Sequence, residues 1–332
     1  MQHSVLILGC GAIAGGYDAQ RPPDDWPLSH AGAIARHDRY TLAACVDPDE
    51  ETRRAVATRW RVPLSLPSPD ALHEKAGAFD LIVIASPTGL HPEHLRLALS
   101  LKPKAVFCEK PLALEAKGIG GLLDDYRTAG IPIGVNFTRR WAPDLVDLAR
   151  DWRAEWGPFL SAAGTYAKGI VHNGSHLVDL IQMILGPQRV CAVGPAVFDH
   201  WYDDPSVAAL LWHQSCASTV HLIAGDARAF TQFELVLSFE KGEVAIRDGG
   251  RRIETRRVID SPHTPGYRQL GPPESAAGRG NEAMMAAYDN LAAAIEDGAP
   301  LASDSANALS AQAICEEIRA RALSRKDDET GL

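Results

Sequence analysis

The residues of this chain with the chemistry to move protons at a reacting alcohol are Lys110 and His176. Oxidation of a secondary alcohol needs a hydride acceptor beside the carbon, a base for the hydroxyl proton, and positive charge near the oxygen. A histidine titrates near neutrality, and a lysine in a partly desolvated cleft can have a lowered pKa, so either side chain could be the base. We favour His176 as the general acid/base and Lys110 as the donor that polarises and positions the oxygen.

Lys110 lies in the tripeptide Glu109-Lys110-Pro111, directly after the apolar run of residues 105–108. Such a run predicts a buried parallel strand, and residues that leave the carboxyl end of a strand line the ligand cleft of open α/β sheets. Because proline follows in a tight turn, we also predict a cis Lys110-Pro111 bond. Asp179, three residues after His176 on the same predicted helix, could orient the imidazole; a solvated or capping carboxylate is the alternative.

A candidate dinucleotide-binding turn follows the apolar run that begins the chain. Its sequence fits G-x-G-x-x-G/A, in which backbone N–H groups approach a pyrophosphate at a helix N-terminus. The residues of the turn are Gly9, Gly11, Ala12, Ile13 and Ala14. A second apolar run, residues 41–46, ends in Asp47, whose carboxylate would accept hydrogen bonds from the adenosine ribose and repel a 2′-phosphate. This pattern favours NAD over NADP.

Residues 16–28 separate this turn from the rest of the first predicted helix. Their glycine, three prolines and three aspartates cannot continue a helix, and they place Asp47 further along the chain than a compact βαβ unit would. We predict an inserted loop, after which Ser29 caps a resumed helix over residues 30–37. The loop could fold over the cofactor or the cleft, or it could be a surface excursion without a role.

Strands and helices alternate up to residue 136 and change character afterwards. Six predicted strands with intervening helices indicate a doubly wound parallel sheet. Beyond about residue 155, β-branched or alternating runs joined by short turns indicate a mainly antiparallel sheet with one solvated face. These runs span residues 206–213, 217–224, 230–239 and 243–248, and we predict helices over 175–185, about 280–297 and 304–323, with a polar loop at 260–280. The predicted α/β domains are residues 1–136 and 137–332, with final helices that could pack back on the first domain.

Composition excludes several classes of function. The 332 residues carry a formal net charge of −9, which gives no general attraction to nucleic acid or to an anionic membrane. No apolar run approaches the ~18 residues of a membrane span, and no signal peptide is evident. The six scattered cysteines never form C-x-x-C, which is typical of reduced thiols in a cytoplasmic protein. We therefore expect a cytoplasmic protein that acts on a small molecule.

The motifs GCGAIAG, ASPTGLH, CEKP, VNFTRR and GSHLVDL, with Asp47 between the first two, follow one another in an order that resembles the glucose-fructose oxidoreductase, inositol dehydrogenase and MocA family (Gfo/Idh/MocA) of nicotinamide-dependent oxidoreductases. The resemblance implies a Rossmann domain and a C-terminal α/β domain with a large, mainly antiparallel open sheet. In this family that sheet often serves as the oligomer interface, so a homodimer or homotetramer is expected. The implied reaction is NAD-dependent hydride transfer at a carbon of a sugar, sugar nucleotide or cyclitol.

The resemblance also assigns roles to individual residues. Ser86, Pro87, Thr88 and His91 are similar to the loop that lines the central part of the cofactor. Glu109 and Lys110 are similar to the pair on the nicotinamide side, and His176 to the catalytic histidine. Asn136 and Arg139 match the stretch that borders nicotinamide and substrate. Tyr166, Lys168, His172, Asn173, His176 and Asp179 are the expected substrate side, although Tyr166 and Lys168 could equally lie on ordinary sheet surface.

His172 departs from the family pattern, because many members have an acidic residue four positions before the histidine. H-x-x-x-H with Asp179 could also hold a metal, but the predicted helix start at Ser175 places His172 outside the helix, and we expect no metal. Two further functions stay open. One is a catalytically silent sugar or NAD sensor on the same fold. The other is a lyase or hydrolase that uses tightly held NAD in a transient oxidation.

Overall fold

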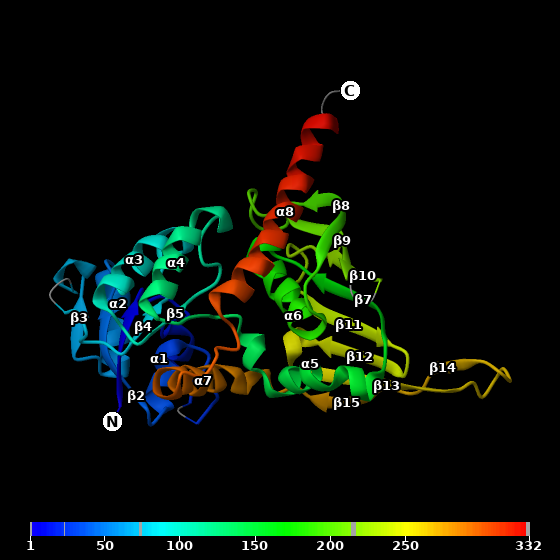
Figure 1. The fold of residues 1–332 in the computed structure, drawn as a ribbon, viewed down its shortest axis with the longest axis horizontal. Helices are drawn as coiled ribbons and strands as arrows, with labels where there is room; N and C mark the ends of the chain where they lie inside the picture. The colour runs from blue at the N-terminus through cyan, green and yellow to red at the C-terminus, as the bar shows by residue number, and fades with distance from the viewer. Residues whose placement is uncertain (1, 23, 73–74, 214–216, 330–332) are drawn as a thin grey trace. The chain divides into compact units, whose positions relative to one another are not determined.

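The computed structural model describes residues 2–22, 24–72, 75–213 and 217–329. The chain divides into two compact units (Figure 1). The first is formed by residues 1–141 and 281–309, and the second by residues 142–280 and 310–332. One late helix, α7 (Ala283–Asp297), belongs to the first unit, whereas most of α8 (Ser305–Glu329) belongs to the second.

The first unit is built on a six-stranded parallel sheet, as the alternation of strands and helices predicted. Its strand order is β3-β2-β1-β4-β5-β6, the order of a doubly wound dinucleotide-binding sheet. The strands are β1 (His3–Leu8), β2 (Tyr40–Val46), β3 (Leu64–Leu66), β4 (Leu81–Ile84), β5 (Ala105–Cys108) and β6 (Ile133–Val135). The central strands β1, β4 and β5 are buried along almost their whole length, which explains their uninterrupted apolar sequences.

Helices cover both faces of this sheet. Its helices are α1 (His30–Arg36), α2 (Glu50–Trp60), α3 (His91–Leu101), α4 (Gly120–Ala129) and α7. On one face, apolar residues of α3 and α4 pack against β1, β4 and β5 in a common core. On the other face, Tyr288 of α7 packs edge-on against Phe107 of β5 at 5.8 Å, so a segment from the end of the chain completes the first unit. A 3₁₀ turn over Pro69–Leu72 follows β3, and residues 73–74 lie outside the described part.

The second unit is built on a nine-stranded sheet, and β7 is parallel to β10 while the other pairs are antiparallel. The strands are β7 (Phe159–Tyr166), β8 (Arg189–Val197), β9 (Ser206–His213), β10 (Ser218–Ala224), β11 (Phe233–Phe239), β12 (Gly242–Arg247), β13 (Arg252–Asp260), β14 (Arg268–Leu270) and β15 (Glu274–Ala277). Burial alternates along β7, β9 and β11, as expected for a sheet with one covered face. In Figure 1 the β13–β14 arm projects away from the rest of this sheet.

Two helices of the second unit are α5 (Pro143–Trp156) and α6 (Ser175–Leu185). A Cβ at Gly164 of β7 would lie 2.7 Å from the Leu177 side chain, so α6 packs closely on the sheet. A π-helical segment, Gly169–Gly174, runs directly into α6. Helix α6 begins at Ser175, as predicted, so His172 lies outside that helix, in the π-helical segment before it. The wider π turn does not give the i, i+4 alignment on which a two-histidine metal site depends.

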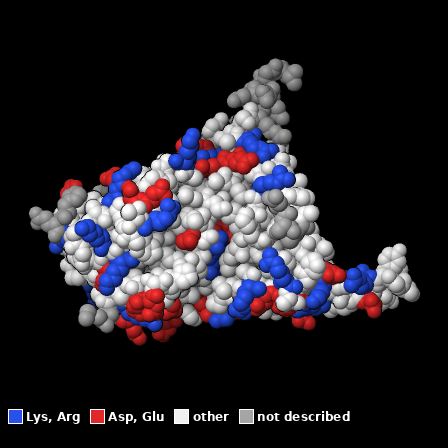
Figure 2. Space-filling model, viewed as in Figure 1, with Lys and Arg blue, Asp and Glu red and all other residues white. Residues whose placement is uncertain are grey.

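Three further features of the chain are the lengths of its helices, its surface charges and its cysteines. No helix in the described ranges is long and apolar enough to cross a membrane. On the face shown in Figure 2, basic and acidic side chains are interspersed. Five cysteines are free thiols, of which Cys191 is exposed and Cys10, Cys45, Cys108 and Cys315 are buried; Cys216 lies outside the described residues.

Candidate functional site

The glycine turn after β1 presents free backbone donors. Gly9 has φ +94°, and a Cβ there would lie 2.6 Å from the backbone nitrogen of Ser86, so only glycine fits this close approach of two strand ends. Within the described part of the chain, the N–H groups of Gly11, Ala12 and Ile13 donate to no acceptor. Gly11 and Ala12 are exposed, and a Cβ on Gly11 would meet no atom within 4 Å. These residues therefore fit the pyrophosphate of a dinucleotide.

The insertion interrupts the helix that normally follows such a turn. The chain leaves through a 3₁₀ turn at Gly16–Asp18 and returns at α1, where the N–H groups of His30 and Ala31 donate to the carbonyls of Ile13 and Ala14 at 3.0 and 2.8 Å. Helix α1 thus continues the hydrogen bonding of the turn across a gap of fifteen residues. The predicted loop and the predicted Ser29 cap, whose Oγ accepts from Gly32 N at 3.2 Å, are both confirmed.

Asp18 organises this insertion from inside. Its carboxylate is 1% exposed and accepts hydrogen bonds from Leu28 N, Ser29 N and the Ser29 hydroxyl, the last at 2.6 Å. Arg21 lies 3.4 Å from the same carboxylate. A buried carboxylate satisfied by backbone donors at the far end of its loop fixes both ends of the excursion. The insertion is therefore an integral part of the first unit, held by its own hydrogen bonds.

Asp47 lies at the carboxyl end of β2, beside the glycine turn. Its Oδ2 accepts from Cys10 N at 2.7 Å and its Oδ1 from Asp49 N at 2.9 Å, which holds the carboxylate against the turn. Each carboxylate oxygen can accept a further hydrogen bond, and the side chain is half-buried. Arg53 donates to the Asp47 carbonyl at 2.7 Å, so a guanidinium is also close to this point.

Glu109 is the centre of a polar network that the motifs did not reveal. Its Oε1 accepts hydrogen bonds from His30 Nε2 at 2.9 Å and from Asn136 Nδ2 at 2.7 Å. His30 is fully buried, and its Nδ1 lies 3.0 Å from the Tyr288 hydroxyl. Burial by itself would raise the pKa of Glu109, but hydrogen bonds and charge from His30, with help from Asn136 and Lys110, hold that pKa below its ordinary value. Glu109 is therefore a charged residue directly beside Lys110.

Nothing in the local sequence identifies His30 or Tyr288 as members of this network. His30 follows a capping serine and Tyr288 lies in an alanine-rich helix, and the chain separates them by 258 residues. His30 reaches Glu109, and Tyr288 reaches His30, because α1 and α7 contact one another.

Lys110 is half-buried at the end of β5, and its peptide bond to Pro111 is cis, as predicted. In the neighbouring loop, residues 86–91, some side chains are accessible to solvent and others are buried. Pro87 is exposed and Thr88 half-buried, so both remain candidates to contact a cofactor. Ser86 is buried, and its hydroxyl lies 2.8 Å from Nδ1 of His94, whose pKa is lowered by burial.

His91 and Asn136 are both buried and hydrogen-bonded within the protein. His91 is 1% exposed, with Nδ1 2.7 Å from the Pro111 carbonyl and Nε2 2.8 Å from the Ser86 carbonyl. Both ring nitrogens lie within hydrogen-bond distance of backbone carbonyls, so His91 ties two loops together; its expected place along the cofactor stays a prediction. Asn136 is 3% exposed and uses its amide on Glu109 and Thr138, so it supports Glu109 from within.

A cavity of about 570 Å³ in the second unit gathers several of the expected substrate residues. Lys168, His172 and Asn173 line it. The same cavity is lined by residues that the sequence did not indicate, among them Phe230, Glu234, Asp248 and Arg251. Glu234 lies on β11 and Phe230 just before it, whereas Asp248 and Arg251 lie in the turn after β12. Strand β11 pairs with both β12 and β7, the strand that Lys168 follows. Adjacency in the sheet, which the sequence does not display, brings these residues together.

Tyr166 does not belong to this surface. It is fully buried, and its hydroxyl donates to the Val207 carbonyl at 2.7 Å and accepts from Val207 N at 2.8 Å. The expectation that Tyr166 binds substrate is therefore wrong, because both hydrogen-bonding capacities of its hydroxyl join β7 to β9. Asp179 is also 1% exposed, which is incompatible with direct substrate contact; its role in orienting His176 stays a prediction.

His172 and His176 differ in their surroundings. His172 is exposed. Its backbone N–H donates to Asp204 Oδ2 at 2.8 Å, and its ring lies 4.3 Å from the Trp201 ring, centre to centre. Burial raises the pKa of Asp204, although hydrogen bonds from Val171 and His172 oppose this. His176 is half-buried in the first turn of α6. Lys110 and half-buried Arg139 belong to the first unit and His176 to the second.

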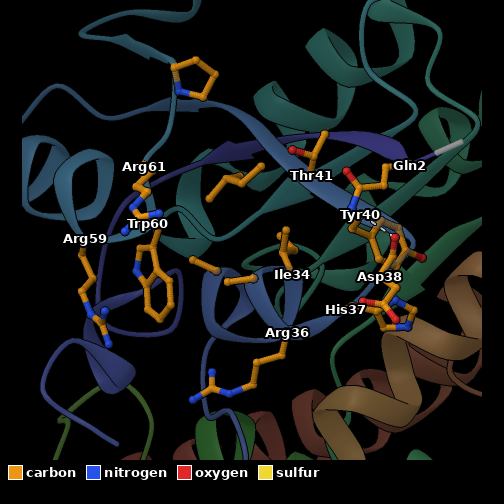
Figure 3. A pocket seen from close by; sticks show the side chains of 14 residues that line it. Gln2, Ile34, Arg36, His37, Asp38, Tyr40, Thr41, Arg59, Trp60 and Arg61 are labelled. Carbon is orange, nitrogen blue, oxygen red and sulfur yellow. Dashed lines mark hydrogen bonds between the residues drawn. The ribbon is translucent and has the colours of Figure 1, made fainter. Parts of the chain in front are cut away.

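A larger groove, about 700 Å³, lies beside the amino end of β2, away from the carboxyl ends of the strands (Figure 3). It is lined by the start of β2 and the last residues of α1 and α2, including Arg36, Arg59 and Trp60. Arg36 donates to the Pro22 carbonyl and Arg59 to the Ala19 carbonyl, so these arginines tether the insertion. Because ligands of such sheets bind at the carboxyl ends of the strands, we do not assign the chemistry to this groove.

Residues 4–137 match the model of a family described as oxidoreductases with an NAD-binding Rossmann fold, GFO_IDH_MocA. Inositol 2-dehydrogenase of Rhizobium meliloti is 24% identical over 314 residues, which cover 86% of this chain and 91% of that protein. Among solved structures, levoglucosan dehydrogenase in complex with NADH has a TM-score of 0.77 at 16% identity, covering 98% of each chain. An NAD-binding oxidoreductase from Klebsiella pneumoniae has a TM-score of 0.78 at 17% identity, again covering 98% of each chain.

Proposed function

We propose that this chain, whose residues 4–137 match the model of the Gfo/Idh/MocA family of NAD-binding oxidoreductases, transfers a hydride between NAD and a secondary alcohol or ketone carbon of a sugar, sugar nucleotide or cyclitol. Its class is that of a dehydrogenase acting on CH–OH groups. The observation that carries the proposal is the turn at residues 11–13, whose free N–H groups fit a pyrophosphate on the sheet that also presents Lys110.

The cofactor side of the proposal rests on Asp47. Its carboxylate, held by Cys10 N and Asp49 N, keeps acceptor capacity for ribose hydroxyls and would repel a 2′-phosphate. The Arg53 guanidinium that could offset this repulsion is engaged with the Asp47 carbonyl. NAD is therefore the proposed cofactor, and when bound its nicotinamide supplies the hydride acceptor.

Lys110 and His176 are the proposed catalytic residues. His176 takes the hydroxyl proton of the substrate as the C–H electron pair leaves as hydride, so the alcohol loses two electrons and two hydrogens and becomes a ketone. The Lys110 ammonium donates to the oxygen as negative charge develops there. Glu109, whose pKa is held below its ordinary value by His30, places negative charge beside Lys110. His172 is proposed to bind a substrate hydroxyl.

The test is NAD reduction by the purified protein over a panel of cyclitols, sugars and sugar nucleotides, together with calorimetric NAD binding. We expect Lys110→Ala to bind NAD nearly normally and to lose turnover by about a hundredfold or more, because Lys110 acts at the reacting oxygen. Lys117→Ala, which removes an exposed lysine from the same unit, is the control. Normal turnover in Lys110→Ala would remove Lys110 from the mechanism, and product formed without net NADH would indicate a transient oxidation instead.

We also propose that the protein is a cytoplasmic homodimer or homotetramer, assembled through the open face of the nine-stranded sheet. That face is only partly covered along β7 and β10, where Ile223 is 47% exposed. Sedimentation of the wild type and of Ile223→Glu tests the assembly, since a charge in the middle of such an interface would disfavour it.

A further inference from the structure

The 570 Å³ cavity of the second unit is lined by two acidic and two basic residues, and the acidic ones form ion pairs with arginines outside its lining. Its two acidic residues are each paired with an arginine: Glu234 with Arg247 at 2.5 Å, and Asp248 with Arg252 at 3.2 Å. The two basic residues of its wall are Lys168 and Arg251. Among the residues that the structure describes, no carboxylate lies within 4.0 Å of either cation. Arg247 and Arg252 also pair with a third carboxylate, Glu254, so the surroundings are nearly balanced overall. Lys168 and Arg251 are nevertheless the cations of the cavity wall that have no carboxylate in direct contact among the described residues.

Lys168 is held in place by its backbone. It has φ +72°, a left-handed conformation that costs free energy in any residue other than glycine. Its N–H donates to Oδ2 of Asp199 at 2.6 Å, and this carboxylate is 4% exposed. The same oxygen accepts from the Ser206 hydroxyl and from Ala227 N, at 3.0 and 3.1 Å. A buried carboxylate with three donors thus fixes the strained residue that starts the π-helical segment.

The side chain of Lys168 is positioned as well. Its Nζ lies 5.7 Å from the centre of the Trp201 ring, within the range of a cation–π interaction, and Trp201 in turn packs against His172. The next residue, Gly169, has no room for a side chain, because a Cβ there would overlap the Asp204 carboxylate. Lys168 is half-buried, unlike an ordinary surface lysine. Arg251 reaches the same cavity from the turn after β12.

We propose that this cavity binds an anionic group of the substrate, held by Lys168 and Arg251. The substrate class is then a sugar or cyclitol that bears a carboxylate or a phosphate, which deepens the proposed function and rests on it. A planar guanidinium and a lysine ammonium together suit an oxyanion with several acceptor oxygens. A wholly neutral polyol would leave both cations unpaired, whereas hydroxyl groups find their acceptors and donors on Asn173 and His172.

The experiment compares matched neutral and anionic probes on the full-length protein with NADH bound. Calorimetry would measure binding of D-glucose, D-glucuronate, D-glucose 6-phosphate, myo-inositol and myo-inositol 1-phosphate, so that carboxylate and phosphate are separate arms. We expect at least one anion to bind about tenfold or more tightly than its neutral partner. Lys168→Met and Arg251→Met should each weaken binding of that anion by roughly 10- to 100-fold, as expected for loss of a charge-assisted hydrogen bond, and leave binding of the neutral partner nearly unchanged.

Two controls separate a charge effect from a structural one. Lys168→Arg should restore most of the preference for the anion, and Lys241→Met, at an exposed lysine of the same unit, should leave it unchanged. Anions that bind no better than neutral partners, or a preference that survives in both methionine variants, would overturn the inference. If neutral polyols are then still oxidised with NAD, the proposed function stands alone; if NADH does not bind, the proposed function itself has failed.

Discussion

Replacing His30 with phenylalanine isolates the contribution of the buried pair at Glu109. The substitution keeps a ring of similar volume against Phe107 and Tyr288, which His30 contacts edge-on at 5.1 and 6.2 Å, but removes both hydrogen bonds of the imidazole. Glu109 Oε1 would keep only Asn136, and the Tyr288 hydroxyl would lose its partner. Removing one hydrogen-bond partner of a largely buried carboxylate costs about 1–3 kcal/mol, so we expect the free energy of unfolding to fall by at least that order.

The pH dependence of this loss gives a second, sharper readout. The pKa of Glu109 is lowered in the folded wild type, so its contribution to stability is present above the unfolded pKa and is lost as pH falls through the folded value. Without His30, the effect of burial on Glu109 dominates, and the pKa of Glu109 in the folded protein rises. The variant therefore becomes less stable, relative to wild type, as pH increases. The difference in unfolding free energy should be larger near about pH 8 than near about pH 5.

Urea unfolding followed by tryptophan fluorescence at these two pH values measures the effect, and His37→Phe is the matched control. His37 Nε2 also contacts a carboxylate, Asp289, at 3.1 Å, but that carboxylate is 66% exposed. Solvent screens this pair on the side of the carboxylate, so we expect a smaller loss than for His30→Phe, although His37 is itself buried and also accepts a hydrogen bond from Arg39 N. Equal losses in the two variants, or a loss for His30→Phe that does not depend on pH, would refute the assignment of Glu109 as a buried carboxylate stabilised by His30.

Three further predictions concern the cofactor and the proposed base. Calorimetry should show NAD binding more tightly than NADP, and Asp47→Ser should narrow the difference; tighter NADP binding to wild type would contradict the role of Asp47. Gly9→Ala should abolish NAD binding or folding, because its Cβ would lie 2.6 Å from Ser86 N; an intact, NAD-binding variant would show that the turn adapts. The rate of alcohol oxidation should rise through roughly pH 6–7.5; His176→Ala should remove this limb, whereas His172→Ala should mainly raise KM, and the opposite pattern would exchange the two roles.

Predictions from local pattern were most successful where one short stretch contains the whole signal. The strand before Gly9, the strand before Glu109 and the helix between Ser175 and Gly186 are confirmed with small changes at their ends. Strands β8, β13, β14 and β15 were missed, and so was α5. Strands β13, β14 and β15 are largely exposed and rich in polar residues, so they lack the apolar alternation that identifies a strand. Strand β8 is apolar in sequence but contains a glycine and a proline, which argue against a strand.

The residues of the candidate site were likewise predictable only where the local sequence was sufficient. Tyr166 and His91 have the residue types of ligand contacts, yet both are buried with their polar atoms bound to backbone. Their burial depends on β9 and on the loop at Pro111, which are 41 and 20 residues away in the chain. The missed residues His30, Tyr288 and Arg251 carry no motif, because their importance comes only from what the fold places beside them.

The amino-acid sequence by itself determined the parallel sheet, the dinucleotide turn and the position of Lys110 at a strand end. These depend on interactions between near neighbours: apolar runs, glycines that permit positive φ, and a proline after a strand. Only the tertiary structure decided that α1 resumes the hydrogen bonding of the turn, that α7 returns to cover β5, and that Lys168 shares a cavity with Arg251. These arrangements depend on which strands and helices become neighbours, and the free energy of that packing is spread over distant segments that no local pattern records.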